Sequence, residues 1–382
     1  MKKILAMLLS AAMVLSMAAC GSKEPDASSA AESGSQAGGD KTVGISMPTK
    51  SLERWNRDGS YLKNEFEQAG YKVELTYSDN DVTQQNNDIS NLIASDIDLL
   101  IVAAIDGEAL TQVLGDAKDA GIPVIAYDRL IMNTDAITYY VSFDNYTVGT
   151  LQGEYVETAL DLANAGDKTY NIEFTAGDPA DNNARYFFGG AYDVLKPYLD
   201  AGTLNIVSGQ NEFEQVATAQ WNTDTALARM QNVLASYYSD GTVLDVALCS
   251  NDSTALGVTQ AIGSDYAGTN QPIITGQDGD IANLRNIVDG TQSMTVYKNV
   301  ANEAVATLEL SKAILAGESP AAELVDSLSI ECTYDTETYD NGTGVIPSYL
   351  LVPTVITKDN LQDLVDTGLY DWDGDYLVST AK

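Results

Sequence analysis

Charged and amide side chains recur directly after the apolar runs of this sequence, where they could act together on one small polar ligand. The run 123–127 is followed by Asp128 and Arg129, and the run 273–276 leads within two residues to Asp278. Carboxylates accept hydrogen bonds, amides accept and donate them, and guanidinium and ammonium groups donate them. A ring of hydroxyl groups requires this mixture, and a tryptophan ring can cover its apolar C–H face. The other candidates of these types are Arg54, Trp55, Asp181, Asn183, Trp221, Asn251 and Lys298.

Helix capping is one alternative explanation for the Asn and Asp residues. Both residue types are favoured at helix N-termini, where they accept hydrogen bonds from backbone N–H groups. Capping accounts for Asp252 and competes with ligand binding for Asn182. It does not explain Arg54, Arg129 or the tryptophans.

An acid/base pair of a glycosidase is a second alternative, because Asp128, Asp181 and Asp278 could supply the two carboxyl groups. Arg129, next to Asp128, would hold that carboxylate ionised. An ionised carboxylate suits hydrogen bonding to a ligand better than proton donation, so we favour binding.

The elements that position these residues alternate between strands and helices. Apolar or alternating runs predict strands, and amphipathic segments between them predict helices. The predicted strands are 42–47, 72–77, 99–103, 123–127, 170–175, 204–209, 246–250, 273–276 and 294–297. The predicted helices are 54–69, 82–95, 109–120, 182–198, 224–239, 252–264, 281–288 and 299–316. We expect 317–344 to be irregular, 345–354 to be extended and 371–375 to be a solvated tail.

This alternation indicates βαβ units and parallel sheets, in which ligands bind beyond the carboxyl ends of the strands. The number of units fits two similar α/β lobes better than one doubly wound sheet. The residues that follow the strands would then face one another across the gap between the lobes.

Composition excludes several classes of function. The chain has 382 residues, with 55 acidic and 20 basic side chains, no histidine and a net charge of −35. Nucleic-acid binders have the opposite balance, and the lack of histidine removes most metal sites and His-based catalytic triads. We expect no metal, no cofactor and no nucleic-acid partner. Cys249 and Cys332 are interpreted as unpaired thiols.

The N-terminus is typical of a lipoprotein signal peptide. Lys2 and Lys3 precede a short apolar run over 4–17, and Met17-Ala18-Ala19-Cys20 has the pattern of a lipobox. We expect residues 1–19 to be removed and Cys20 to carry the lipid, with 20–40 as a flexible tether to the outer face of the cell membrane. The alternative is an ordinary secretory signal in which Cys20 has no role.

The chain resembles the solute-binding lipoproteins of sugar ABC transporters, most of all the xylose-binding and multiple-monosaccharide-binding periplasmic proteins. The resemblance covers residues 42 to about 358. It is carried by Ser46-Met47-Pro48-Thr49 with Arg54-Trp55, Ile105-Asp106-Gly107, Ile125-Ala126-Tyr127-Asp128-Arg129-Leu130, Phe143-Asp144-Asn145, Asp181-Asn182-Asn183-Ala184, Gly276-Gln277-Asp278, Thr295-Val296-Tyr297-Lys298 and Pro347-Ser348-Tyr349-Leu350-Leu351.

The resemblance implies a type I periplasmic binding protein fold, in which two Rossmann-like lobes are joined by a three-strand hinge. The N-terminal lobe would comprise 41–141 and 299–347, and the C-terminal lobe 142–298 and 348–382. The hinge crossings would lie near 141–143, 297–299 and 348–351.

The resemblance also implies the ligand contacts. Hydrogen bonds to a monosaccharide of the xylose, glucose, galactose or arabinose type would come from Arg54, Asp128, Arg129, Asp181, Asn183, Asn251, Asp278 and Lys298, while Trp55 and Trp221 would stack on its two faces. The protein would be a monomer without enzymatic activity that closes on the sugar and delivers it to an ABC permease. Alternatives are a sensor that presents its closed form to a chemoreceptor or histidine kinase and, less favoured, the glycosidase.

Overall fold

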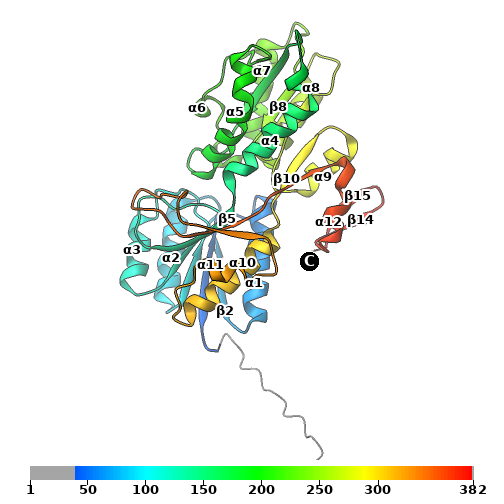
Figure 1. Ribbon diagram of the computed structural model, residues 1–382. Helices are drawn as coiled ribbons and strands as arrows, with labels where there is room; N and C mark the ends of the chain where they lie inside the picture. Colours follow the sequence, from blue (N-terminus) through cyan, green and yellow to red (C-terminus); the bar gives the residue numbers. More distant parts are fainter. Residues whose placement is uncertain (1–38, 381–382) are drawn as a thin grey trace, which may run out of the picture. The chain divides into compact units, whose positions relative to one another are not determined.

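The structure, a computed structural model, describes residues 39–380, which contain two lobes with mainly parallel sheets (Figure 1). The signal peptide, Cys20 and almost all of the tether lie outside the described residues. The first sheet has seven strands in the order β11-β12-β5-β4-β3-β1-β2. Only β11 runs antiparallel to its neighbour. The strands are β1 (Thr42–Met47), β2 (Lys72–Tyr77), β3 (Leu99–Val102), β4 (Val124–Tyr127), β5 (Ile137–Phe143), β11 (Cys332–Asp335) and β12 (Ser348–Leu351).

Helices cover both faces of the first sheet. α1 (Glu53–Gln68) and α10 (Val300–Leu315) pack on one face, and α2 (Val82–Ala94) and α3 (Thr111–Asp119) pack on the other. Burial on both faces explains why β3 and β4 are continuous apolar runs rather than alternating ones.

The second sheet has four parallel strands in the order β7-β6-β8-β9. They are β6 (Tyr170–Thr175), β7 (Leu204–Asn205), β8 (Val246–Cys249) and β9 (Ile273–Ile274). α4 (Asn145–Ala159) and α5 (Asn183–Asp200) pack on one face, and α7 (Thr223–Tyr237) and α8 (Asp252–Asp265) pack on the other. α4 and α5 approach closely, because a Cβ atom at Gly149 would lie 2.0 Å from the carbonyl oxygen of Phe187.

A smaller apolar cluster joins the C-terminal segment to the second lobe. It contains α9 (Ile281–Asp289), the antiparallel pair β10 (Met294–Tyr297) and β13 (Thr354–Thr357), α12 (Gln362–Asp366), and the hairpin β14 (Tyr370–Asp373) and β15 (Tyr376–Ser379). Residues 371–375 are therefore part of a hairpin, and the interpretation as a tail is wrong. Tyr370 and Leu377 anchor the hairpin in the apolar cluster.

The remaining short helices are α6 (Phe213–Val216), α11 (Ala322–Val325) and the 3-10 turns Leu162–Asn164, Ala219–Trp221 and Lys358–Asn360. Among the described residues, no helix is long and apolar enough to cross a membrane. Cys249 and Cys332 are buried free thiols, as interpreted from the sequence.

The chain connects the two lobes three times, after β5, after β10 and after β12 (Figure 1). β12 pairs with β5 in the first sheet, whereas the boundary drawn at residue 348 assigns it to the C-terminal lobe. The strand expected over 204–209 stops at Asn205, because Ser208 turns to donate to the buried carboxylate of Glu173. The segment 317–344, expected to be irregular, contains α11 and β11.

Candidate ligand-binding site between the two lobes

A small cavity lies between the lobes and is lined by nine of the ten residues that the sequence singles out. Each of these nine side chains is largely buried. The predicted residues in the lining are Arg54, Trp55, Asp128, Arg129, Asp181, Trp221, Asn251, Asp278 and Lys298, and the lining is completed by Leu52, Phe187, Ser253 and Gln277.

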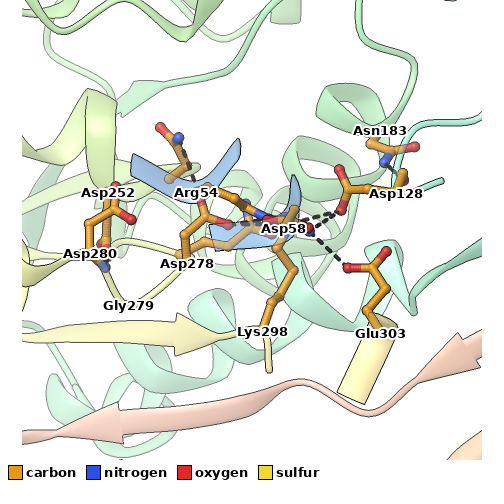
Figure 2. A network of polar contacts seen from close by, with 12 residues as sticks. Arg54, Asp58, Asp128, Asn183, Asp252, Asp278, Gly279, Asp280, Lys298 and Glu303 are labelled. Atoms are coloured by element: carbon orange, nitrogen blue, oxygen red, sulfur yellow. Dashed lines mark hydrogen bonds and ion pairs between the residues drawn. The ribbon is translucent and has the colours of Figure 1, made fainter. Parts of the chain in front are cut away.

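Arg54 is the centre of the polar network shown in Figure 2. It lies in the first turn of α1, and its Nη2 atom is 2.6 Å from Oδ1 of Asp128 and 3.0 Å from Oε2 of Glu303. Its Nη1 atom donates to Oδ1 of Asp278 in the other lobe at 3.3 Å, and its Nε atom donates to Oδ2 of Asp58 at 3.2 Å. One guanidinium therefore joins four carboxyl groups from both lobes.

The backbone turn at Asp128 aims its carboxylate at the cavity. This residue follows β4 with a φ of 57°, in the left-handed region that is uncommon for residues other than glycine. Three donors fix its carbonyl oxygen: the hydroxyls of Tyr140 at 2.7 Å and Ser142 at 2.8 Å, and Nδ2 of Asn183 at 2.6 Å. Asn183 is the one predicted residue outside the cavity lining, and in this structure it holds the turn that carries Asp128.

Burial and neighbouring charges shift the pKa values of the acids around Arg54 in opposite directions. Burial alone would raise the pKa of Asp128, but Arg54, Lys298 and Arg129 bring it to about 2. Burial raises the pKa of Glu303 well above its usual range, and Asp128 raises it further despite Arg54. Burial also raises the pKa of Asp58. Asp128 is thus an ionised acceptor.

Asp181 joins an aromatic and a cationic group on the other side of the cavity. Its Oδ2 atom accepts from Nε1 of Trp221 at 3.2 Å and lies 3.0 Å from Nε of Arg129. The guanidinium of Arg129 lies over the ring of Trp55, 4.9 Å from the centroid, and donates to the carbonyl of Ala104. Asp128 and Arg129, adjacent in sequence, therefore take different partners.

Local backbone geometry seats Trp221 in the cavity. Gln220 and Trp221 have φ values of 57° and 53°, which turn the chain sharply before α7. A Cβ atom at Gly177 would lie 1.9 Å from the indole ring, so only glycine leaves room for it there. Trp221 also packs edge-on against Phe187, with ring centroids 6.1 Å apart.

The remaining predicted residues meet at the end of the second sheet. Oδ1 of Asp278 lies 3.3 Å from Nζ of Lys298, which is also 3.4 Å from Oδ1 of Asp128. Nδ2 of Asn251 donates to Oδ2 of Asp278 at 3.5 Å. The cap of α8 is Asn251, whose side chain accepts from the backbone of Thr254, rather than Asp252 as expected.

Several residues around the cavity were not predicted from the sequence. Asp58 could have been found, because it lies four residues after Arg54 on a predicted helix and so on the same face. Glu303 lies 249 residues from Arg54 in the sequence, and no local sequence pattern indicates that the two side chains pair. Phe187 resembles an ordinary core residue of an amphipathic helix. Within the part of the chain that the structure describes, no group of three or more acidic, Cys or His side chains is arranged to hold a metal ion.

Comparison with known proteins identifies the class of protein that carries this geometry. A family model described as "periplasmic binding protein domain" matches residues 43–319. The chain belongs to this family. The periplasmic binding protein is 41% identical over 336 residues to the multiple sugar-binding periplasmic receptor ChvE of Rhizobium radiobacter, covering 87% of this chain and 91% of the relative. It is 33% identical to the D-xylose-binding periplasmic protein of Escherichia coli, covering 85% of this chain and 88% of the relative.

Two solved structures resemble this periplasmic binding protein. An ABC transporter solute-binding protein of Clostridium phytofermentans with bound β-D-glucose is 50% identical, with a TM-score of 0.82, and the match covers 87% of this chain and 98% of that one. A carbohydrate transporter solute-binding protein of Chloroflexus aurantiacus in complex with D-glucose is 32% identical, with a TM-score of 0.75 and coverages of 87% and 97%. The predicted family and the type I periplasmic binding protein fold are confirmed.

Proposed function

We propose that this protein binds one neutral monosaccharide in the cavity between its lobes and releases it chemically unchanged to an ABC importer. The observation that carries the proposal is the lining itself, which combines hydrogen-bonding carboxylates, amides and cations with the aromatic rings of Trp55, Trp221 and Phe187. Relatives whose names record sugar or xylose binding, and neighbours solved with glucose, support the same ligand class.

The arrangement favours binding over hydrolysis. A glycosidase needs one carboxyl group that donates a proton and a second that acts as nucleophile or base. Here Asp128 and Asp278 both lie against Arg54 and Lys298, and Asp128 keeps a pKa of about 2. Asp128 can therefore accept hydrogen bonds from hydroxyls without transferring a proton.

Closure of the lobes would bring the two halves of the site together. Arg54 and Asp128 belong to the first lobe, and Asp181, Asn251 and Asp278 to the second. A ligand that bonds to both sets binds the closed arrangement better than an open one and shifts the population toward it. The closed form is then the signal that a permease, or in the alternative a membrane sensor, would recognise.

The proposal extends to the location of the protein. Residues 1–19 would be a signal peptide, Cys20 the lipidated residue, and 20–40 the tether that holds a monomeric binding protein at the outer face of the membrane. The lipobox sequence supports this part of the proposal.

A thermal-shift panel of aldopentoses and aldohexoses tests the ligand class. A sugar at 100 times its dissociation constant should stabilise the protein by about 2.7 kcal/mol. NMR of the recovered sugar should show it unchanged. No shift with any member of the panel would contradict the proposal, and release of free monosaccharide from a disaccharide would favour the glycosidase.

A further inference from the structure

A second contact between the lobes lies next to the cavity, and its side chains do not line it. Arg57, one turn after Glu53 on α1, is buried and directs its guanidinium into the second lobe. Its Nη2 atom donates to the carbonyl oxygen of Asp278 at 3.0 Å and to Oδ1 of Asp280 at 3.1 Å. Its Nη1 atom donates to the carbonyl oxygen of Gly279 at 3.0 Å and to the hydroxyl of Tyr370 at 2.7 Å.

These bonds hold the backbone from which Asp278 reaches the cavity. Asp278 has a φ of 107° and Gly279 a φ of 72°, so the loop is in a left-handed conformation that costs free energy at Asp278. The hydroxyl of Tyr370 donates to the carbonyl oxygen of Gly279 at 3.0 Å, which ties the C-terminal hairpin to the same loop. Arg57 therefore fixes the backbone of Asp278, whose carboxylate pairs with Arg54 and Lys298.

Glu53 completes the contact at the start of α9. The N-cap residue of this helix, Asp280, makes no side-chain cap bond of its own, because its carboxylate faces Arg57. The carboxylate of Glu53, from the other lobe, accepts instead from the backbone N–H of Ile281 at 3.3 Å. An acid at a helix N-terminus is favoured by the helix dipole.

We propose that Arg57, with Glu53 and Tyr370, is an inter-lobe latch that positions Asp278 and stabilises the closed form without contacting the ligand. The proposal rests on the proposed function, because it concerns the closure that a bound sugar would promote. Arg57 and Glu53 belong to the first lobe, and their acceptors and donors to the second, so opening breaks every one of these bonds. Removing Arg57 would also leave buried partners without a donor.

Titration calorimetry with D-glucose or D-xylose tests the latch. We expect Arg57→Met to weaken sugar binding by about tenfold or more, since a buried charge-assisted contact is lost from the closed form only. Arg57→Lys keeps the charge but not the four-way contact and should recover part of the affinity. The matched control is Arg185→Met, because Arg185 is half exposed and pairs with Glu214 within the second lobe. It should leave affinity within about twofold of the original.

Tyr370→Phe keeps the ring packing against Tyr297 and removes only the hydroxyl. We expect a loss of about two- to threefold in affinity, which disappears in the Arg57→Met background because the two groups act together. Folding of each variant is checked by circular dichroism. Unchanged affinity in both Arg57 variants, or additive effects of Arg57→Met and Tyr370→Phe, would overturn the latch.

A readout without sugar separates this proposal from the proposed function. Hydrogen exchange of the Ile281 amide, which donates to Glu53, should accelerate in Arg57→Met and not in Arg185→Met. If the unmodified protein bound no monosaccharide, the proposed function would fail and this exchange rate would still decide on the latch. Unchanged exchange at Ile281 would overturn it.

Discussion

The charged side chains that line the cavity are buried, and they form pairs of opposite charge. Arg54 and Lys298 face Asp128 and Asp278, and Arg129 faces Asp181. Unpaired charges are unfavourable in such a place, whereas paired ones leave free lone pairs and N–H groups for a polar ligand. The cavity can therefore offer strong hydrogen bonds without carrying a large net charge.

Asp278→Asn tests the contribution of one such charge with little change in shape. We expect sugar affinity to fall about 10- to 100-fold, because a hydrogen bond to a charged group is worth roughly 1.5–3 kcal/mol. Calorimetry measures the change, and circular dichroism confirms the fold. Asp200→Asn, which removes an exposed partner of Lys196, is the control and should bind like the original protein. Affinity of Asp278→Asn equal to that of the control would remove Asp278 from the site.

Residue types at strand ends could be predicted from the sequence, whereas their partners could not. A strand end is a local feature, and a parallel sheet places all such ends on one edge. The positions of Asp128, Asn251 and Asp278 near the ends of strands could therefore be predicted. The role of Asn183 could not be predicted. Its side chain donates to the carbonyl oxygen of Asp128, and this contact depends on the φ of 57° at Asp128, which no sequence pattern indicates. Which of two polar groups faces a ligand depends on such angles.

At the scale of elements, the site depends on how strands and helices end. The turn before α7 seats Trp221, and its ring fills space that a side chain at position 177 would need. The strands β1, β2, β6 and β10 have the bounds expected from the sequence, whereas the helix ends differ from the expected ones by up to two residues. The hairpin β14–β15 was missed because most of the exposed side chains over 371–375 are acidic, the side chain of Trp372 is exposed too, and only Tyr370 and Leu377 reach the core.

Gly177→Ala tests the seat of Trp221. The added methyl group must displace the indole, so we expect a loss of about tenfold or more in sugar affinity and a change in tryptophan fluorescence. Gly189→Ala adds the same group in open space on α5 and should alter neither. If both variants bind sugar equally well, Trp221 is not held where the ligand binds.

At the scale of the whole molecule, buried acids set how stability depends on pH. Burial, with Asp278 and Glu53 nearby, raises the pKa of Asp280 from 3.8 to about 7, although Arg57 lowers it. At a pH between these two pKa values, Asp280 is protonated in the folded protein and ionised in the unfolded chain. This stabilisation is complete below pH 4 and is lost as the pH rises through 7.

The unfolding temperature should therefore fall between pH 5.5 and pH 8. Asp280→Asn mimics the protonated form and should reduce this slope, with an effect on the order of a few kcal/mol at pH 8. Calorimetric scans across the pH range measure both proteins, with Asp200→Asn as the control. If Asp280→Asn left the pH dependence of the unfolding temperature unchanged, this would contradict a raised pKa of Asp280 in the folded protein.

Anchoring of the molecule can be tested on the full chain. Expressed with its signal peptide, it should partition into the detergent phase through the lipid on Cys20, and Cys20→Ser should move it to the aqueous phase. Equal partitioning of both proteins would contradict lipidation at this cysteine. An ordinary secretory signal would give this result.

A crystal structure of the complex with a monosaccharide that stabilises the protein would show directly whether the sugar binds between the lobes. We predict one intact sugar there, with hydroxyl oxygens within hydrogen-bonding distance of Asp128, Asp278 and Asn251, and with Trp221 against its ring. A sugar bound elsewhere on the protein, or these side chains separated around an empty gap at saturating sugar, would contradict it.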